Sequence, residues 1–256
     1  MGTRFSGAST TGSARDAPAI LLWQAWLILA LVLGCAGTKS DDAADSARNR
    51  VSAGHHAATS LHLKKINDLG GHWFRTGGRI TVYLHDPAAS GETLRALVPH
   101  LAALPELKTL RLTHTQWDDG AAALLRSLRH LTALDLGDSV ITDRALESIG
   151  SLSTLVELNL DDTDVTDAGL PHLKSLASLR SLSLAGTRVG DEGAAHLTAL
   201  AGLRELNLSQ TQVTDAAIAR LAELRQLERL RIFGTRISDD GVARLRQARP
   251  TLLIIR

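Results

Sequence analysis

The chain has 256 residues, enough for one or two domains with a sizeable core. Its 28 lysines and arginines nearly balance its 27 acids and only 3% of its residues are aromatic, which argues against the basic, base-stacking surface of a nucleic-acid-binding protein. The single cysteine excludes an internal disulfide and a cysteine-rich metal site.

Residues 1–34 are expected to be a signal peptide or a membrane anchor. No charged residue lies between Ala17 and Thr38, and Arg4 and Arg15 precede this apolar run. Such a run is typical of a secretory signal, and it is also long enough to cross a bilayer uncleaved. In both cases the arginines before the run place the rest of the chain outside the cytoplasmic membrane. A third alternative, N-myristoylation, is indicated only by the short start MGTRFS.

The only cysteine lies at the end of this run, in the segment LVLGCAG. The segment resembles the lipobox of bacterial lipoproteins, at which the leader is cleaved and a lipid is attached. The resemblance implies that Gly34 is the last residue removed and that Cys35 carries a diacylglyceryl group, although Leu33 stands where a small residue is commoner. We therefore expect an exported protein of the bacterial envelope, anchored on the outer side of the cytoplasmic membrane.

Residues 35–60 are small and polar without apolar periodicity, and are expected to form a flexible tether. Residues 61–106 are expected to form an N-terminal cap and an irregular first repeat, with an amphipathic stretch over 61–69 and a strand over 80–84. At the other end, RPTLLIIR predicts a last strand with no helix after it. The edge of that strand can pair with another chain, so the oligomeric state stays open.

Three leucine positions recur with a period of 24 residues from Leu107 onward. They give each repeat the pattern L-x-x-L-x-L, as in LVELNL. The alternation L-x-L predicts a strand with one buried face, and the spacing of apolar residues in the following segment, as in GLPHLKSL, predicts a helix. The first leucine position is occupied by Leu107, Leu131, Leu155, Leu179, Leu203 and Leu227.

One strand and one helix cannot bury their apolar sides alone, so the repeats are expected to stack. The pattern resembles the leucine-rich repeat family, and its VTDAGL segments are similar to the cysteine-containing and bacterial members. The resemblance implies an α/β leucine-rich-repeat solenoid over residues 107–256, with six regular repeats after the N-terminal cap. Because helices are wider than strands, we expect a curved parallel sheet on the concave face and helices on the convex face.

An aspartate follows each predicted strand at the same spacing, mostly after a threonine or serine. Thr-Asp before a helical pattern is an N-terminal signal, because side-chain oxygens accept hydrogen bonds from free backbone N–H groups. We therefore expect this column to cap the helices as part of the scaffold, with each carboxylate facing a positive helix end. The column consists of Asp119, Asp143, Asp167, Asp191, Asp215 and Asp239.

No set of side chains with the spacing of a catalytic or metal site stands apart from the repeats. His172 and His196 occupy equivalent positions on successive predicted helices, without an acid or cysteine at ligand spacing. Gly77 and Gly78 follow no predicted strand and open no helix, so they do not indicate a phosphate-binding loop. The sequence predicts a protein that is not an enzyme and holds no metal or cofactor.

The remaining candidate site is the concave face, where the variable positions of L-x-x-L-x-L point away from the core. Acidic residues gather in the second and third repeats, and basic residues lie at the far end beside an aromatic one. We expect this face to bind a protein partner through a complementary basic segment. The alternative is an assembly component of the cell envelope whose concave face is an ordinary solvated surface. The candidate partner-binding residues are Arg111, Asp135, Asp138, Glu157, Asn159, Asp161, Asp162, Asn207, Arg231 and Phe233.

Overall fold

The computed structural model describes residues 48–86, 89 and 91–256. The chain divides into two units, Met1–Asp45 and Ser46–Arg256, and every described residue belongs to the second. The expected signal peptide or anchor over 1–34 and the expected lipid attachment at Cys35 lie outside the described residues. Within the described ranges, no helix is both long and apolar enough to span a membrane.

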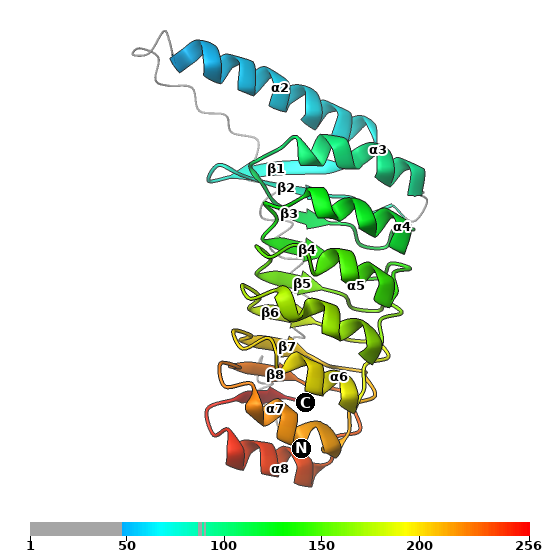
Figure 1. The fold of residues 1–256 in the computed structure, drawn as a ribbon, viewed down its shortest axis with the longest axis vertical. Helices are drawn as coiled ribbons and strands as arrows, with labels where there is room; N and C mark the ends of the chain where they lie inside the picture. Colours follow the sequence, from blue (N-terminus) through cyan, green and yellow to red (C-terminus); the bar gives the residue numbers. More distant parts are fainter. Residues whose placement is uncertain (1–47, 87–88, 90) are drawn as a thin grey trace, which may run out of the picture. The chain divides into compact units, whose positions relative to one another are not determined.

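Nine strands form one sheet, and their order across the sheet is their order along the chain (Figure 1). The first two strands pair antiparallel, and each later pair of neighbours is parallel. Each strand from β4 on therefore lies beside the equivalent strand of the repeat before it. The strands are β1 His72–Thr76, β2 Arg79–Tyr83, β3 Leu107–Arg111, β4 Ala133–Asp135, β5 Glu157–Asn159, β6 Ser181–Ser183, β7 Glu205–Asn207, β8 Arg229–Arg231 and β9 Leu253–Ile255.

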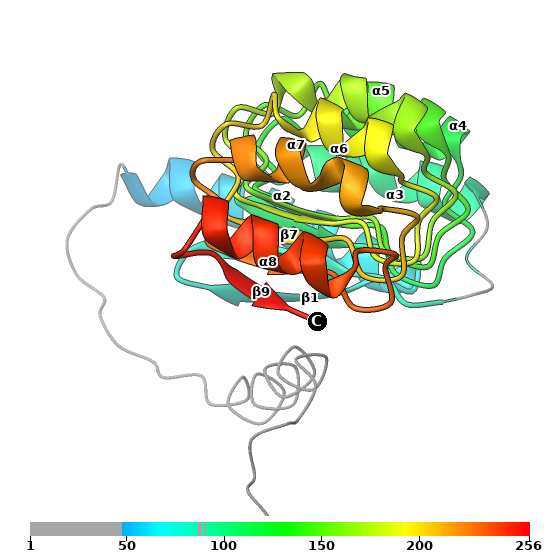
Figure 2. The same ribbon diagram turned by 90° about the horizontal axis from the view of Figure 1, so that it is seen from below.

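The helices of the repeats cover one side of this sheet, and the other side, the concave face, is left open (Figure 2). This arrangement confirms the predicted α/β solenoid. The helical segments are α2 Arg48–Asp68, α3 Gly91–Ala102, α4 Asp119–Ala122, η1 Ala123–Ser127, α5 Asp143–Ile149, η2 Asp167–Ser175, α6 Asp191–Leu197, η3 Asp215–Ala217, α7 Ile218–Glu223 and α8 Asp239–Ala248, where η marks a 3-10 helix.

The leucine columns of the sequence fill the layer between sheet and helices. Leu134 pairs in register with Leu158, Leu158 with Leu182, and the column continues to Ile254. All three predicted columns are buried in every repeat. Because burying one leucine contributes about 1.5–3 kcal/mol, these columns are the main source of the stability of the stack.

The helical half of the repeat is wound differently from one repeat to the next. α5 and α6 are α-helices, whereas η2 is a 3-10 helix of nine residues that contains Gly169 and Pro171. Glycine raises the entropic cost of an α-helix interior and proline removes a backbone donor from it. The apolar spacing therefore predicted a helix here without predicting its winding.

The expected flexible tether over 35–60 is corrected from Arg48 onward, where helix α2 begins. Near the end of α2, Leu63 and Ile66 are buried in the common core. A helix anchored at one end continues readily through an alanine-containing segment such as AGHHAAT, because alanine is the strongest helix former. This anchor depends on tertiary packing, which the composition of the segment does not show.

A β-hairpin between α2 and the first repeat was not predicted. β1 and β2 are joined by Gly77 and Gly78, with φ of 56° and 75°, and two positive φ values are what a tight two-residue hairpin turn requires. The statement that these glycines follow no strand is therefore wrong, although they lead into a strand and not into a helix. The pair of glycines between HWFRT and RITVY was a usable hairpin signal.

The predicted aspartate caps are corrected in their geometry. Each aspartate is the first residue of its helical segment, and the residue before it is the N-cap. In η2, for example, the Thr166 hydroxyl accepts a hydrogen bond from the Ala168 N–H at 3.2 Å. The N-cap residues are Asp118, Thr142, Thr166, Gly190, Thr214 and Ser238.

The aspartate carboxylates instead connect neighbouring repeats. Asp143 accepts hydrogen bonds from the backbone N–H and the hydroxyl of Thr166 in the next repeat, at 2.8 and 2.7 Å. Asp119, Asp191 and Asp215 each make the same pair of bonds. The two exceptions are Asp167, which bonds only the Gly190 N–H at 2.6 Å, and Asp239, which pairs with Arg256.

Candidate functional site

Two rows of side chains cross the concave face, at the first and third positions of the short strands. Most of them are half-buried between their neighbours in the row. The first row is Thr109, Ala133, Glu157, Ser181, Glu205, Arg229 and Leu253, and the second row is Arg111, Asp135, Asn159, Ser183, Asn207, Arg231 and Ile255.

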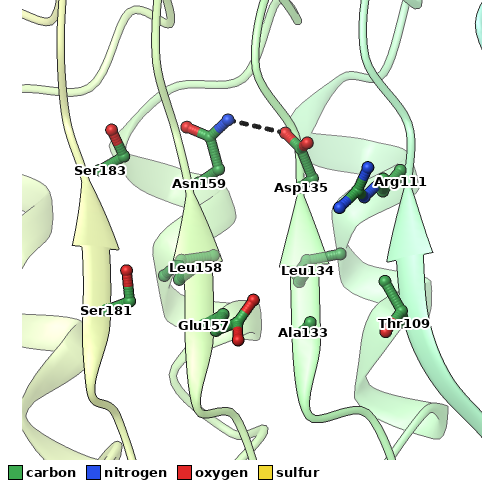
Figure 3. Close-up of a pocket in the computed structure, with 10 residues that line it drawn as sticks. All are labelled: Thr109, Arg111, Ala133, Leu134, Asp135, Glu157, Leu158, Asn159, Ser181 and Ser183. Atoms are coloured by element: carbon green, nitrogen blue, oxygen red, sulfur yellow. Dashed lines mark hydrogen bonds between the residues drawn. The ribbon is translucent and has the colours of Figure 1, made fainter. Parts of the chain in front are cut away.

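Asp135 lies at the end of β4 in the second row and is half-buried. Its Oδ1 atom accepts hydrogen bonds from the Asn159 side-chain amide at 2.9 Å (Figure 3) and from the Gly137 backbone N–H at 3.2 Å. Burial raises the pKa of Asp135 above its ordinary value of 3.8, and these hydrogen bonds and the Arg111 guanidinium offset the rise only in part. The carboxylate is therefore held where its charge is disfavoured.

Asp161 follows β5 and is also half-buried. Its Oδ1 atom accepts hydrogen bonds from the Ser183 hydroxyl at 2.5 Å and from the Ala185 backbone N–H at 2.7 Å. The pKa of Asp161 is raised, with burial as the largest cause; these hydrogen bonds lower it, and the charges of Asp162 and Asp135 raise it further. A second disfavoured carboxylate thus lies one repeat away from the first.

Uncharged side chains of the second row hold these two aspartates in place. Asn159 donates to Asp135 and, through its own Oδ1, accepts from the Asp161 backbone N–H at 2.9 Å. Ser183 donates to Asp161 and accepts from the Asn207 side-chain amide at 3.0 Å. A continuous chain of hydrogen bonds therefore runs from Asp135 to Asn207 and fixes the orientation of this part of the face.

A hollow lies over the strands β3 to β6 (Figure 3). The small side chain of Ala133 on β4 and the Glu157 side chain on β5 are among its lining residues. Glu157 is exposed, and its carboxylate has no hydrogen-bond or ion-pair partner in the described part of the chain, whereas the carboxylate of Glu205 in the same row pairs with Arg229. The hollow is lined by Thr109, Arg111, Ala133, Leu134, Asp135, Glu157, Leu158, Asn159, Ser181 and Ser183.

Asp138 and Asp162 lie in the turns after β4 and β5, at the edge of the face and not on the strands themselves. Both have positive φ, 55° and 54°, which aspartate tolerates better than most residues. The Asp138 carboxylate lies 3.3 Å from His114 Nε2, and burial and the Asp138 charge raise the pKa of Asp162. We call Asp135, Asp138, Glu157, Asp161 and Asp162 the acidic patch.

The left-handed turn position is a feature that the sequence reasoning missed. This position recurs at the same place in each repeat and is occupied by glycine or by a polar residue. That composition could have predicted a left-handed backbone conformation there. The residues with positive φ in this column are His114, Asp138, Asp162, Gly186, Gln210 and Gly234.

The predicted basic end of the concave face has fewer unpaired arginines than expected. Arg229 forms an ion pair with Glu205, so its positive charge is already paired within the chain. Arg231 is half-buried and makes no hydrogen bond or ion pair with its side chain inside the described ranges. Phe233 follows it and is 63% exposed.

No three His, Cys, Asp or Glu side chains among the described residues are grouped so that they hold a metal ion. His172 and His196 are exposed, on η2 and α6. Two other histidine pairs make ring contacts that no spacing in the sequence indicated, because each joins neighbouring elements. They are His62 with His100, at ring centroids 5.3 Å apart, and His85 with His114, at 4.7 Å.

A sequence model described as "Leucine-rich repeat region" matches residues 91–254. The chain belongs to the leucine-rich repeat family. The match begins at α3, so the leucine-rich repeat region includes the irregular first repeat. Domains of this family generally mediate protein interactions and are typically not enzymes.

Among solved structures, internalin C2 from Listeria monocytogenes is similar to this leucine-rich repeat protein at 24% sequence identity. The similarity covers 60% of this chain and 71% of that chain, with a TM-score of 0.48. No curated protein matches the chain significantly.

Proposed function

We propose that this leucine-rich repeat protein is an exported, membrane-tethered and non-catalytic module whose acidic patch binds a basic segment of a protein partner. The observation that carries the proposal is the placement of Asp135 and Asp161. Each carboxylate is half-buried on the concave face, and burial raises the pKa of each. A cation from a partner relieves this penalty, because an opposite charge favours the ionised form.

The hydrogen bonds of these two residues do not need a charge. In each residue one oxygen, Oδ1, accepts both bonds. An asparagine side chain offers the same acceptor without a desolvated charge, and so serves the fold at least as well. The hydrogen bonds therefore do not account for the negative charge at either position, and we infer that the charges serve binding, although the Arg111 guanidinium also favours the charge of Asp135.

Glu157 and the hollow beside it supply the room for such a cation. The Glu157 carboxylate has no partner among the described residues, and Glu157 lines the hollow together with Ala133 and Asp135. A lysine or arginine side chain of a partner that lies in this hollow is surrounded by residues that include Glu157 and Asp135 as well as Arg111. A charge-assisted hydrogen bond to each carboxylate is about twice as strong as a neutral one.

The tether rests on the sequence of the first 35 residues. A basic start, an apolar run and the LVLGCAG segment support cleavage after Gly34 and a lipid on Cys35. The lipid determines the location of the protein on the outer side of the cytoplasmic membrane, and the concave face determines what it binds there.

The test is cross-linking capture from intact cells, read by mass spectrometry. The wild-type chain is compared with Asp135→Lys/Asp161→Lys/Asp162→Lys and with the isosteric Asp135→Asn/Asp161→Asn. The isosteric variant keeps the hydrogen-bond acceptors, so it still tests the charge if the lysine substitutions disturb folding. A matched control, Asp68→Lys/Glu192→Lys/Asp240→Lys, changes the net charge equally at exposed positions away from the concave face.

A protein captured by the wild type and by the control, and lost from both concave-face variants, supports the proposal. If all four chains capture the same neighbours, the acidic patch is ordinary solvated surface. The protein is then better described as an assembly component of the cell envelope without a ligand on the concave face.

A further inference from the structure

The concave face changes from polar to apolar at its far end. Leu253 and Ile255 of β9 continue the two rows and are 54% and 39% exposed. Phe233, in the turn after β8, is 63% exposed. Ile255 is the register partner of Arg231, Leu253 is that of Arg229, and Phe233 lies two positions after Arg231 along the chain. We call Arg231, Phe233, Leu253 and Ile255 the Arg231 end.

The Arg231 guanidinium has no ion-pair partner within the described part of the chain, whereas Arg229 pairs with Glu205. A half-buried guanidinium has lost part of its hydration and gains when a ligand supplies an anion. Its planar donors fit a carboxylate with two parallel hydrogen bonds. Apolar neighbours favour apolar groups beside that carboxylate, because both surfaces then leave water together.

Between the acidic patch and the Arg231 end, the side chains of the second row are uncharged. β5 and β8 are three strands apart, about 14 Å at the usual strand spacing of about 4.8 Å. An extended segment of about four or five residues covers this span. Most residues between the two ends are small or uncharged, namely Ser181, Ser183, Ala185, Asn207 and Ser209, and the first row adds Glu205, which is paired with Arg229.

We infer that the Arg231 end binds an acidic residue flanked by apolar side chains, on the same partner segment whose basic residues occupy the acidic patch. This inference rests on the proposed function, because it takes the acidic patch as the first contact. The partner segment is thereby oriented, with its basic part over β4 and β5 and its acidic, apolar part over β8 and β9. The reversed segment places like charges together at both ends, which is unfavourable.

The experiment measures the affinity of three synthetic peptides for the full chain in detergent micelles by isothermal titration calorimetry. The first peptide carries only a Lys-Lys pair. The third peptide carries only the Glu-Leu-Phe sequence. The second joins Lys-Lys to Glu-Leu-Phe through a flexible glycine-serine linker of about five residues. The chains compared are the wild type, Arg231→Gln/Phe233→Ser, and a control, Arg246→Gln/Val140→Ser, that changes an exposed arginine and an exposed apolar residue elsewhere.

We expect the second peptide to bind the wild type and the control at least about tenfold more tightly than the first, because the second contact is intramolecular once the first is made. In Arg231→Gln/Phe233→Ser this advantage is expected to disappear, at an unchanged melting temperature. Equal affinities of the first two peptides for the wild type, or an advantage that survives in the variant, overturn the inference.

Failure of the proposed function gives a different result. In that case the Lys-Lys peptide does not bind, while the Glu-Leu-Phe peptide still binds the wild type and not the variant. If none of the three peptides binds at low salt, both the proposed function and the inference are wrong.

Two other occupants of the Arg231 end are separate outcomes. A dimer in sedimentation that dissociates on the Phe233→Ser substitution would assign this end to a second copy of the chain. Phosphatidylglycerol vesicles that bind the wild type more strongly than Arg231→Gln/Phe233→Ser would assign it to a lipid surface. Either result overturns the inference, which expects a monomer and equal vesicle binding.

Discussion

At the scale of single residues, Asp135 and Asp161 make the stability of the protein depend on pH in a specific direction. Burial raises the pKa of both above the ordinary value of 3.8, so the folded state holds these protons to higher pH than the unfolded state does. Their contribution to stability is therefore largest in acid and is lost as the pH rises from 3.8 through the raised pKa values.

We predict that Asp135→Asn/Asp161→Asn is at least as stable as the wild type at neutral pH. Each 1 kcal/mol gained raises the melting temperature by about 2–4 °C in a chain of this size. The advantage of the variant shrinks as the pH is lowered toward 3.8, because the wild-type aspartates then become neutral too. Thermal unfolding followed by circular dichroism across this pH range measures it.

Asp215 is the control, because its pKa is shifted in the opposite direction. Hydrogen bonds from the hydroxyl and the backbone N–H of Ser238, and the Arg244 charge, lower its pKa. Its contribution to stability is present above pH 3.8 and is lost as the pH falls through the lowered pKa, so Asp215→Asn is expected to be less stable than the wild type at neutral pH. A loss of stability in Asp135→Asn/Asp161→Asn like that in Asp215→Asn would show that the concave-face charges serve the scaffold.

The sequence identified Asp135 and Asp161 as residues of the face but not as residues with a disfavoured charge. Alternation along a strand predicts which side chains leave the core, and Leu134 and Asp135 follow that rule. The degree of burial of Asp135 depends on Asn159 beside it, in the next repeat. That contact joins residues 24 positions apart and depends on the register of the stack.

At the scale of the repeat element, the bonds between aspartates and the next cap residue are expected to stabilise the stack unequally. Asp143 accepts two hydrogen bonds from Thr166, and Asp167 accepts one from Gly190. We predict that Asp143→Ala costs about 1–3 kcal/mol, since it leaves a backbone donor without its partner, and that Asp167→Ala costs less. Urea unfolding of both variants measures the difference.

Asp164→Ala is the matched control in that experiment. Asp164 also carries a charge that links two repeats, through an exposed ion pair with Arg188. Such surface pairs contribute about 0–1 kcal/mol. If Asp164→Ala costs as much as Asp143→Ala, the bonds of the aspartate column have no special role in joining repeats.

Gly190 is a position at which a substitution is expected to stabilise the protein. It is an N-cap without a side-chain hydrogen bond, and its extended backbone, with φ −120° and ψ −156°, resembles that of Thr166 and Thr214. We predict that Gly190→Thr stabilises the protein by about 0.5–1 kcal/mol, by adding a cap and by lowering the entropy of the unfolded chain. A melting temperature below that of the wild type would contradict this account of the column.

The element scale also shows where the sequence pattern was sufficient. The 24-residue period predicted the strands and, to within one residue, the position of each helix start, since both depend on contacts inside one repeat and its neighbours. The cap residue was placed one position too late, because Thr-Asp offers two acceptors and the pattern cannot choose between them. Helix α2 was missed over 48–60 because its stability comes from the anchored residues that follow.

At the scale of the whole molecule, the proposal joins a binding face to a membrane through the segment before the solenoid. The expected lipid on Cys35 is a separate claim with its own test. We predict that Cys35→Ser abolishes incorporation of labelled palmitate and moves the protein from the detergent phase to the aqueous phase in Triton X-114 partition. Retention in the detergent phase without label would indicate an uncleaved transmembrane anchor instead.

The central claim is that the charge of Asp135 and Asp161, and not their hydrogen bonding, serves a partner. The most direct measurement is calorimetric titration of the full chain and of Asp135→Asn/Asp161→Asn with the Lys-Lys peptide, at low and at physiological salt. The account predicts at least about tenfold weaker binding by the variant, as expected when charge pairs worth about 1.5 kcal/mol or more are removed, together with a melting temperature no lower than that of the wild type. Equal binding by the two chains at both salt concentrations would contradict it.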